Sequence, residues 1–406
     1  MLWMVPAGLC LASCLAMLLW PAFLAKVGIY DYGSRFLDSQ ALLAALDAVR
    51  AGADPHAVNP LDPLMRGHVY SDWWLGLRWL GLTRAHNDVV AAVLLTGFAV
   101  TAGLTIRPRR WGEALWLAAL LVSPAVALVL NRANNDLVIF LLLAGCGLAA
   151  GAAGWRLGVA LGCLVLATGL KYYPVVAAIP FLWTKPSRRA PAVMLVAVVL
   201  ATVALASVWS QVGRGRFMIG SGVYTMGAPL WWRDFGWSDA QSAWPGVALL
   251  AALAGLFARL KVTTGLGTHG DERERLLAAI GATVILACFV AGVNYSYRWI
   301  FVLWPAGWAW RRTCDGALPT RPRVAAALAC GLVALALWQD GLFCAAINAL
   351  PPRDVVWVDR AQRVFRLCTQ PLQWLLMGLL AGWLLEGAWS LAQEWRRNSA
   401  PERSRQ

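Results

Sequence analysis

The sequence predicts an all-α polytopic membrane protein, from its composition, the length of its apolar blocks and the placement of its charges. Hydrophobic residues make up 60% of the 406 residues and charged residues 14%, against roughly 45–50% and about 25% in soluble domains. The apolar residues form blocks of about 20, the length with which an α-helix crosses a bilayer. The net charge of +14 comes from basic residues in short loops, which indicates membrane orientation rather than nucleic-acid binding.

The apolar blocks predict about twelve transmembrane helices. They cover approximately residues 4–28, 88–106, 111–130, 136–153, 156–170, 172–184, 190–210, 244–261, 276–293, 299–311, 322–339 and 370–389. We interpret the first block as a retained helix, because it lacks the basic segment and cleavage site of a signal peptide. Five regions follow: a first helix (1–28), an outer loop with juxtamembrane helices (29–87), a transmembrane core with outer loops (88–311), C-terminal transmembrane helices (312–389) and a cytoplasmic tail (390–406).

The fifth and sixth blocks are each short for a full crossing, and Lys171 and Pro174 interrupt them. Such a segment is tolerated at membrane depth only where protein or water covers its backbone. We therefore expect a broken or re-entrant helix pair over 156–184.

Basic side chains follow every even-numbered block, which predicts that those loops and the C-terminus face the cytoplasm. They are Arg107, Arg109, Arg110, Arg156, Lys185, Arg188, Arg189, Arg259, Lys261, Arg273, Arg275, Arg311, Arg312, Arg321, Arg323, Arg396, Arg397, Arg403 and Arg405. Lys26 and Arg35, at the far end of the first block, disagree with this pattern. The opposite face then holds the polar segments 29–87, 131–136, 171–174, 211–243, 294–298 and 340–369.

Asp38 precedes a predicted amphipathic helix, on which Leu42, Ala45, Leu46 and Val49 share one face. An aspartate at a helix start satisfies free backbone N–H groups, so Asp38 is an N-cap, a catalytic base or both. Asp31 is the second candidate base. Later in this loop, residues 69–82 carry Trp and Leu at helical spacing and predict an interfacial helix.

The segment NRANND (131–136) lies between two apolar blocks and offers many donors for hydroxyl groups or a phosphate. Asn and Asp also favour turns, and Asp136 could simply cap the next helix. We take Arg132 as a candidate for phosphate binding. The candidates for binding a sugar or acceptor here are Asn131, Asn134 and Asn135.

Lys171 and Arg298 are cations that enter the same face from different predicted helices. A lysine near the bilayer centre costs several kcal/mol and marks a functional site by default, unless it snorkels to the interface. Two such cations suggest a shared anion, most naturally a phosphate.

Known cofactor motifs are missing from the sequence: it has no H-E-x-x-H pattern, Walker loop, dinucleotide fingerprint or G-x-S-x-G elbow. We expect neither a metal nor a cofactor. The nine cysteines lack metal-type spacing, and a disulfide between Cys344 and Cys368 is possible because both lie in or near one outer loop.

In the order and common sidedness of these motifs, the chain resembles the GT-C glycosyltransferases, most closely the bacterial polyprenyl-phosphate-mannose-dependent α-mannosyltransferases. Asp38 and the following ALLAALDAVRAGADPH are similar to the family's D-x-x-x-Y-x-x-A…G-x-D-P-Y run, with Leu42 and His56 in place of its tyrosines. GLKYYP looks like the Lys-x-x-Pro segment, and NYSYRWIFVLWP like the Tyr-x-Tyr-Arg-Leu motif. NRANND stands where the family often has Gly-Gln-x-Asn, and the Gly-Gln pair is absent.

The resemblance implies an inverting transfer of a sugar, mannose in the closest group, from a polyprenyl phosphate to a hydroxyl of a glycan or glycolipid outside the cytoplasm. Asp38, or else Asp31, would be the base, and Lys171, Arg298 and Arg132 would bind the donor phosphate. The tyrosines of the two motifs join the three asparagines as sugar- or acceptor-binding candidates: Tyr172, Tyr173, Tyr295 and Tyr297.

A lipid-linked-saccharide flippase or another multi-spanning transporter is the main alternative, because buried charges and broken helices also occur in transporters. No internal repeat is visible, and the polar residues gather at one face rather than at the midplane. A non-catalytic membrane scaffold is a third possibility.

Overall fold

The computed structural model describes residues 1–20, 24, 28–29, 34–149, 155–183, 195–196, 198–207, 209, 223–262, 271–351 and 355–399. Over these residues the fold is helical, apart from one antiparallel pair of two-residue strands. The predicted all-α class is therefore confirmed for the described residues. Asp31 and the basic cluster at 185–189 lie outside the described residues.

The described α-helices, in chain order, are α1 (Met4–Leu19), α3 (Leu37–Arg50), α4 (Asn87–Ile106), α5 (Trp111–Leu121), α6 (Pro124–Asn131), α7 (Asp136–Ala149), α8 (Trp155–Leu170), Val198–Ser207, α10 (Ala228–Arg233), α11 (Asp239–Arg259), α12 (Glu272–Ala291), α13 (Leu303–Thr313), α14 (Thr320–Asn348) and α15 (Val355–Ser399). The 3₁₀ helices are η1 (Trp74–Leu80), η2 (Arg84–His86), η3 (Tyr173–Trp183) and η4 (Ser296–Val302), and the strands are β1 (Thr225–Met226) and β2 (Asn294–Tyr295).

Four described helices are long and apolar enough to cross a membrane: Arg84–Ile106, Ala240–Arg259, Glu272–Ala291 and Thr320–Asn348. A fifth span is formed if α5 and α6, bent by 55° at their junction, are counted together. The structure therefore fits an integral membrane protein. Twelve crossings are not shown, because several predicted blocks form helices of only 10–17 residues, among them α1, α7 and α8.

The predicted break near Lys171 is present. α8 ends at Leu170, and the chain continues from Tyr173 as the 3₁₀ helix η3, which packs against α12. The interfacial helix expected at 69–82 is also shorter and tighter than predicted, because only Trp74–Leu80 is helical and its type is 3₁₀.

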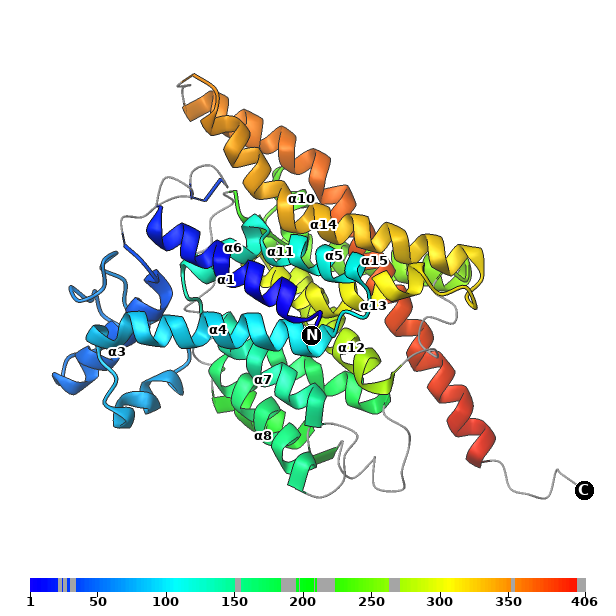
Figure 1. Ribbon diagram of the computed structural model, residues 1–406, viewed down its shortest axis with the longest axis horizontal. Coiled ribbons are helices and arrows are strands. Elements are labelled where there is room, and N and C mark those ends of the chain that lie inside the picture. Colours follow the sequence, from blue (N-terminus) through cyan, green and yellow to red (C-terminus); the bar gives the residue numbers. More distant parts are fainter. Residues whose placement is uncertain are drawn as a thin grey trace, which may run out of the picture.

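The helices pack around a buried centre that includes α12 and η4. Figure 1 shows α1 and α4 side by side, with α3 beyond the end of α4 that lies away from the N-terminus. Every residue of η4 is buried, among them Trp299 and Phe301. This buried helix carries Arg298, so the fold itself places that cation in the protein interior.

Polar contacts join the loops in two separate sets. In the first, Arg311 pairs with Glu113 at 2.6 Å and with Glu274, and Arg109 pairs with Glu274 at 2.6 Å. Arg109 and Glu274 come from loops predicted to be cytoplasmic, and Glu113 and Arg311 lie at those ends of predicted blocks that border such loops. In the second set, β1 pairs with β2, and Arg366 contacts Asp234 at 2.8 Å. These come from loops predicted on the opposite face, so the sorting of loops into two groups matches the contacts.

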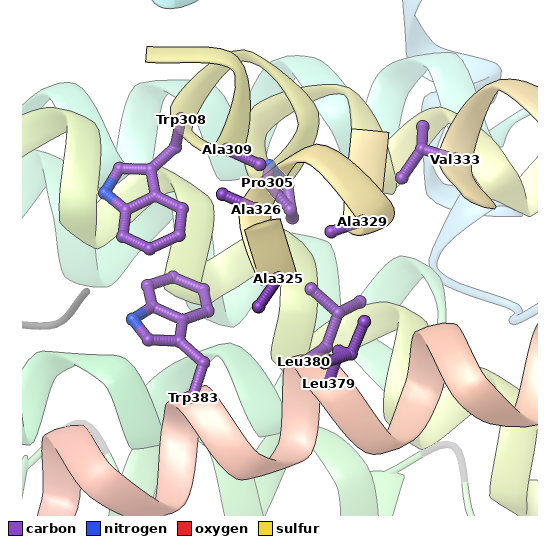
Figure 2. Close-up of a pocket in the computed structure, with 10 residues that line it drawn as sticks. All are labelled: Pro305, Trp308, Ala309, Ala325, Ala326, Ala329, Val333, Leu379, Leu380 and Trp383. Carbon is purple, nitrogen blue, oxygen red and sulfur yellow. The ribbon is translucent and has the colours of Figure 1, made fainter. Parts of the chain in front are cut away.

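The C-terminal helices enclose an apolar pocket with α13 (Figure 2). Trp308 and Trp383 stack with their ring centroids 4.4 Å apart, and Ala325, Ala326 and Ala329 of α14 are among the other residues that line the pocket. The question of a disulfide between Cys344 and Cys368 is answered here: the two residues lie on α14 and α15, and both are free cysteines.

Candidate functional site

The backbone fixes Asp38 beside the end of α6. The N–H of Asp38 donates to the carbonyl of Arg132 at 2.9 Å, and the N–H of Phe36 donates to that of Asn131 at 3.1 Å. Phe36, at a left-handed φ of 54°, is the N-cap of α3, and Asp38 lies in the first turn. The interpretation of Asp38 as an N-cap is therefore wrong, and its carboxylate is available to side chains.

The Asp38 carboxylate is buried and receives hydrogen bonds from two residues of the NRANND turn, Arg132 and Asn134. Arg132 donates to its two oxygens at 2.8 Å from Nε and 2.7 Å from Nη2. Asn134 donates to Oδ2 at 2.5 Å. Such a two-point arginine contact fixes both position and orientation of the carboxylate.

Arg66 is a third partner of Asp38, and it was not predicted from the sequence pattern. Its Nη1 lies 3.3 Å from Oδ1 of Asp38, the longest contact that this carboxylate makes to a cation. Asp62 holds the same guanidinium more tightly, accepting from Nε at 2.8 Å and Nη2 at 3.0 Å. Arg66 thus bridges two aspartates of the segment between α1 and α4.

Asp136 is the centre of a second group of charges. It is the first residue of α7, but Asn134 rather than Asp136 makes the local contact, accepting from the N–H of Asp136 at 2.9 Å. The Asp136 carboxylate instead binds the Lys171 ammonium and accepts from the Tyr173 hydroxyl at 2.5 Å. Nε of Arg298 lies 3.6 Å from its Oδ2. Asp136 therefore does more than begin a helix.

Tyr70 connects the two groups. The Lys171 ammonium lies 5.5 Å from the centroid of its ring, within the range of a cation–π contact. Burial raises the pKa of the Tyr70 hydroxyl, and the negative charges of Asp38 and Asp136 add to the effect. We call the connected set the two-aspartate cluster, after the two aspartates at the centres of its groups, Asp38 and Asp136. It comprises Asp38, Asp62, Arg66, Tyr70, Arg132, Asn134, Asp136, Lys171, Tyr173 and Arg298.

The cluster keeps Asp38 ionised. Burial by itself would raise the pKa of this carboxyl, but the charge of Arg132 and the hydrogen bonds from Arg132 and Asn134 outweigh it. The pKa of Asp38 therefore lies below the ordinary aspartate value. A carboxylate in this state can accept a proton once a partner moves away.

Asp38, Arg132, Asn134, Lys171, Tyr173 and Arg298 were all predicted from sequence, and the structure brings them together. Other predicted residues hold different positions. Asn131 contributes its backbone carbonyl to Phe36, and Asn135 is buried with its amide nitrogen lacking a hydrogen-bond partner among the described residues. Tyr172 packs edge-on against Tyr173, and Tyr295 stacks on the buried Tyr297 at 5.3 Å.

Asp136 was predicted only as a possible helix cap, and sequence reasoning missed three further cluster residues, Asp62, Arg66 and Tyr70. They lie in NPLDPLMRGHVY (59–70), whose Pro, Gly and Asp content indicates only a loop. A buried aspartate in such a loop leaves no periodic pattern. Which cation such an aspartate pairs with depends on the conformation of the whole loop.

The described residues contain no group of three or more His, Cys, Asp or Glu side chains placed to hold a metal ion. What the cluster offers is cations: Arg66, Arg132, Lys171 and Arg298 stand against the carboxylates of Asp38, Asp62 and Asp136. An anion is the ligand that such a set accepts best.

Comparison with known proteins adds no assignment. No family model, curated protein or solved structure matches the chain.

Proposed function

We propose that this chain is an integral-membrane inverting glycosyltransferase that uses a polyprenyl-phosphate sugar. The sugar, mannose by the motif resemblance, passes to a hydroxyl of a glycan or glycolipid on the non-cytoplasmic face. The proposal includes a GT-C-like helix bundle of about twelve crossings. Its support is the two-aspartate cluster together with the motif order of the sequence.

The observation that carries the proposal is the excess of one cation over the carboxylates in the buried cluster. Lys171 and Tyr173 already occupy Oδ1 of Asp136. Arg298 is 9% exposed, and its Nε has no hydrogen-bond partner among the described residues. A buried guanidinium without full pairing is costly, and a phosphate oxygen would complete it. One phosphodiester carries one negative charge and would balance the cluster.

The chemistry needs a single base. The bond between the anomeric carbon and the phosphate oxygen breaks, and the leaving polyprenyl phosphate keeps that electron pair. The acceptor oxygen attacks the opposite face of the anomeric carbon, and its proton passes to Asp38. Lys171 and Arg298 would stabilise the charge that builds on the leaving phosphate, as fixed electrostatic partners do in other transfers.

Arg66 offers a way to free the base. It makes the longest cation contact with Asp38 and is independently paired with Asp62. An acceptor hydroxyl that displaces Arg66 from Oδ1 therefore leaves no guanidinium unpaired, whereas displacement of Arg132 would break two short hydrogen bonds. Only the Arg66 side of Asp38 is open to exchange at low cost.

The test is to incubate purified full-length protein with radiolabelled polyprenyl-phosphate mannose or glucose and a membrane lipid extract, and to identify the labelled product. Asp38→Asn should lose transfer by about 10²–10⁴-fold, the usual contribution of a general base. It also leaves Arg132 without its counter-charge, so loss of activity by itself would not separate catalysis from folding.

The charge-balanced variant Asp38→Asn/Arg132→Gln resolves this. It removes both members of the ion pair, so we expect its melting temperature to recover part of the loss while transfer stays absent. Recovery of transfer together with stability would refute the base assignment. Movement of labelled donor across sealed vesicles without any product would favour a flippase instead.

A further inference from the structure

Asn134 lies at the junction of α6 and α7, and its main chain belongs to both helix ends. Its N–H donates to the carbonyl of Val129 at 3.0 Å, and its own carbonyl accepts from the N–H of Leu137 at 2.9 Å. The preceding residue, Ala133, has a left-handed φ of 42°, which a residue with a side chain adopts only where the surrounding structure holds it. The backbone therefore fixes the direction in which the Asn134 side chain leaves the junction.

The two ends of the Asn134 carboxamide have opposite kinds of partner, and these partners assign its two polar atoms. The N–H of Asp136 can only donate, so the carboxamide atom 2.9 Å from it is Oδ1. The other end is then Nδ2, which donates to Oδ2 of Asp38 at 2.5 Å. An ionised carboxylate can only accept, so this orientation of the amide agrees with the ionised state of Asp38.

The Asn134 side chain is closed to a ligand. The residue is 0% exposed, and both polar ends of its carboxamide have protein partners. From sequence, Asn134 was a candidate for binding a sugar or acceptor. Its enclosed position between two aspartates favours a role that acts through Asp38 instead.

A single carboxamide thus joins the two groups of the cluster. One end contacts the carboxylate of Asp38, the candidate base. The other end contacts the main chain of Asp136, whose side chain holds Lys171, a candidate for donor binding. In an inverting transfer the base and the leaving phosphate lie on opposite sides of the anomeric carbon, so the distance between the two groups has to be fixed.

We infer that Asn134 is a positioning residue, which holds the Asp38 carboxylate ionised and at a fixed distance from the donor-binding side, and that it does not contact the sugar. The catalytic part of this inference rests on the proposed glycosyl transfer. Its electrostatic part, a titration of Asp38 that depends on residue 134, can be measured without any transfer.

The substitution Asn134→Asp is nearly isosteric and tests the inference directly. One oxygen of the new carboxyl keeps the hydrogen bond from the N–H of Asp136. The other oxygen replaces the donor to Asp38 and brings two carboxylates into contact. Such a pair shares one proton, which raises the pKa of the pair above that of Asp38 in the wild type. The base is then partly protonated in mildly acidic solution.

The first readout is the melting temperature of the purified full-length protein between about pH 7 and about pH 5. Asp38 should contribute no pH dependence to the wild type in this range, because its folded-state pKa is depressed. The Asn134→Asp protein should become more stable as the pH falls, because its folded state binds more protons there than its unfolded state. The second readout is the pH profile of transfer, in which the variant should gain an acid limb of up to about tenfold per pH unit.

The exchanged variant Asp38→Asn/Asn134→Asp separates this role from a purely structural one. It keeps one carboxylate and one carboxamide in contact, so the shared proton is lost and the melting temperature should again be insensitive to pH over the same range. Transfer should stay absent, because the carboxylate no longer stands at position 38.

Asn87→Asp is the matched control for an added charge. Asn87 accepts a hydrogen bond from the Ser39 hydroxyl at 2.6 Å at the start of α4, and among the described residues it contacts no carboxylate. Its melting profile should follow that of the wild type. If Asn134→Asp does not fold, Asn134→Ala replaces it. That variant removes the donor without adding a charge, and its melting temperature should fall less steeply below about pH 4 than that of the wild type.

A melting profile of Asn134→Asp parallel to the wild type would overturn the inference. A profile that the exchange at position 38 does not restore, or an equal change in Asn87→Asp, would do the same. The expected titration in a protein without transferase activity would sustain the positioning of Asp38 and reject the proposed function. Transfer with an unaltered pH profile in Asn134→Asp would reject the positioning role and leave the proposed function in place.

Discussion

At the scale of single residues, the two central aspartates of the cluster, Asp38 and Asp136, differ in how their charges are balanced. Asp38 has a bidentate arginine and an asparagine, and Arg66 is shared with Asp62. Asp136 has two cations, Lys171 in direct contact and Arg298 at 3.6 Å. Because the two charges are balanced differently, substitutions around Asp38 and around Asp136 should have different, measurable effects.

The depressed pKa of Asp38 predicts how stability changes with pH. Because the folded-state pKa lies below the unfolded value of about 3.9, the contribution of Asp38 to stability is complete above that value. It is lost as the pH falls through the folded pKa. Transfer activity should therefore show no acid limb from Asp38 between pH 5 and 8.

Melting curves recorded from pH 7 down to pH 3 check this prediction. The wild type should lose stability more steeply below about pH 4 than Asp38→Asn/Arg132→Gln, which lacks the titrating pair. Parallel curves for the two proteins would show that Asp38 is not held ionised by its neighbours.

Substitutions of Lys171 and Arg298 should distinguish effects on stability from effects on donor binding. Lys171→Met removes the ammonium in direct contact with Asp136 and should cost about 3–5 kcal/mol of unfolding free energy, because a buried carboxylate loses its close partner. Arg298→Met removes the excess charge and leaves the Lys171 contact in place, so its cost should stay near 1 kcal/mol or below.

Both substitutions should raise the KM for a polyprenyl-phosphate sugar more than the KM for the acceptor. The measurement is steady-state transfer at varied donor and varied acceptor, beside urea or thermal unfolding. If Arg298→Met destabilises the protein as much as Lys171→Met, or leaves donor use unchanged, Arg298 is not a cation reserved for the phosphate.

At the scale of elements, the break after α8 depends on how the segment between α3 and η1 packs. The Trp74 indole donates to the carbonyl of Leu170 at 3.1 Å, at the last residue of α8. Gly169 lies against the ring of Trp73, and a β-carbon there would overlap that ring. The glycine therefore permits the loop to cover the helix end, next to Lys171.

Gly169→Ala should accordingly destabilise the protein by about 1–3 kcal/mol through overpacking. It should also lower transfer activity. Displacing the contact between residue 169 and Trp73 should shift Lys171, which lies two residues further along the chain. Gly162→Ala, on the same helix with open space at the β-carbon, is the control and should be neutral or slightly stabilising. Equal melting temperatures for the two variants would show that the Trp73 contact is not needed.

At the scale of the whole molecule, the two sets of loop contacts predict opposite sides of a membrane. The exposed Cys314 lies beside the Arg312–Asp315 ion pair, next to the set that joins Arg109, Glu113, Glu274 and Arg311. The exposed Cys368 lies two residues after Arg366, which belongs to the other set.

A membrane-impermeant maleimide applied to intact cells should label Cys368 and spare Cys314 until the membrane is permeabilised. Cys368→Ser and Cys314→Ser assign the label to each position. Labelling of both residues from outside would reject the two-sided arrangement. The reverse pattern would place the two-aspartate cluster on the cytoplasmic side and reject the proposed use of an outward-facing donor.

Sequence patterning was reliable where the signal is local or periodic. The helix after Asp38 and the break at Lys171 follow from spacing and from a charge next to a proline, and both are present. The type and straightness of helices were less predictable. The apolar segment η3 is a 3₁₀ helix, and α5 and α6 are bent at their junction. The packing of η3 against α12, and of α5 and α6 against their neighbouring helices, decides these features. A hydropathy pattern carries no information about such packing.

By itself, the sequence determined that the protein is helical and that its helices suit a membrane, and it predicted which polar segments share a face. Those properties depend on composition, on block length and on where the charges lie along the chain. The tertiary structure alone decided the partners within the site: Arg132 and Arg66 for Asp38, Lys171 and Arg298 for Asp136. An ion pair requires contact within a few ångströms, and contacts between residues as far apart as 38 and 132 exist only once the helices have packed.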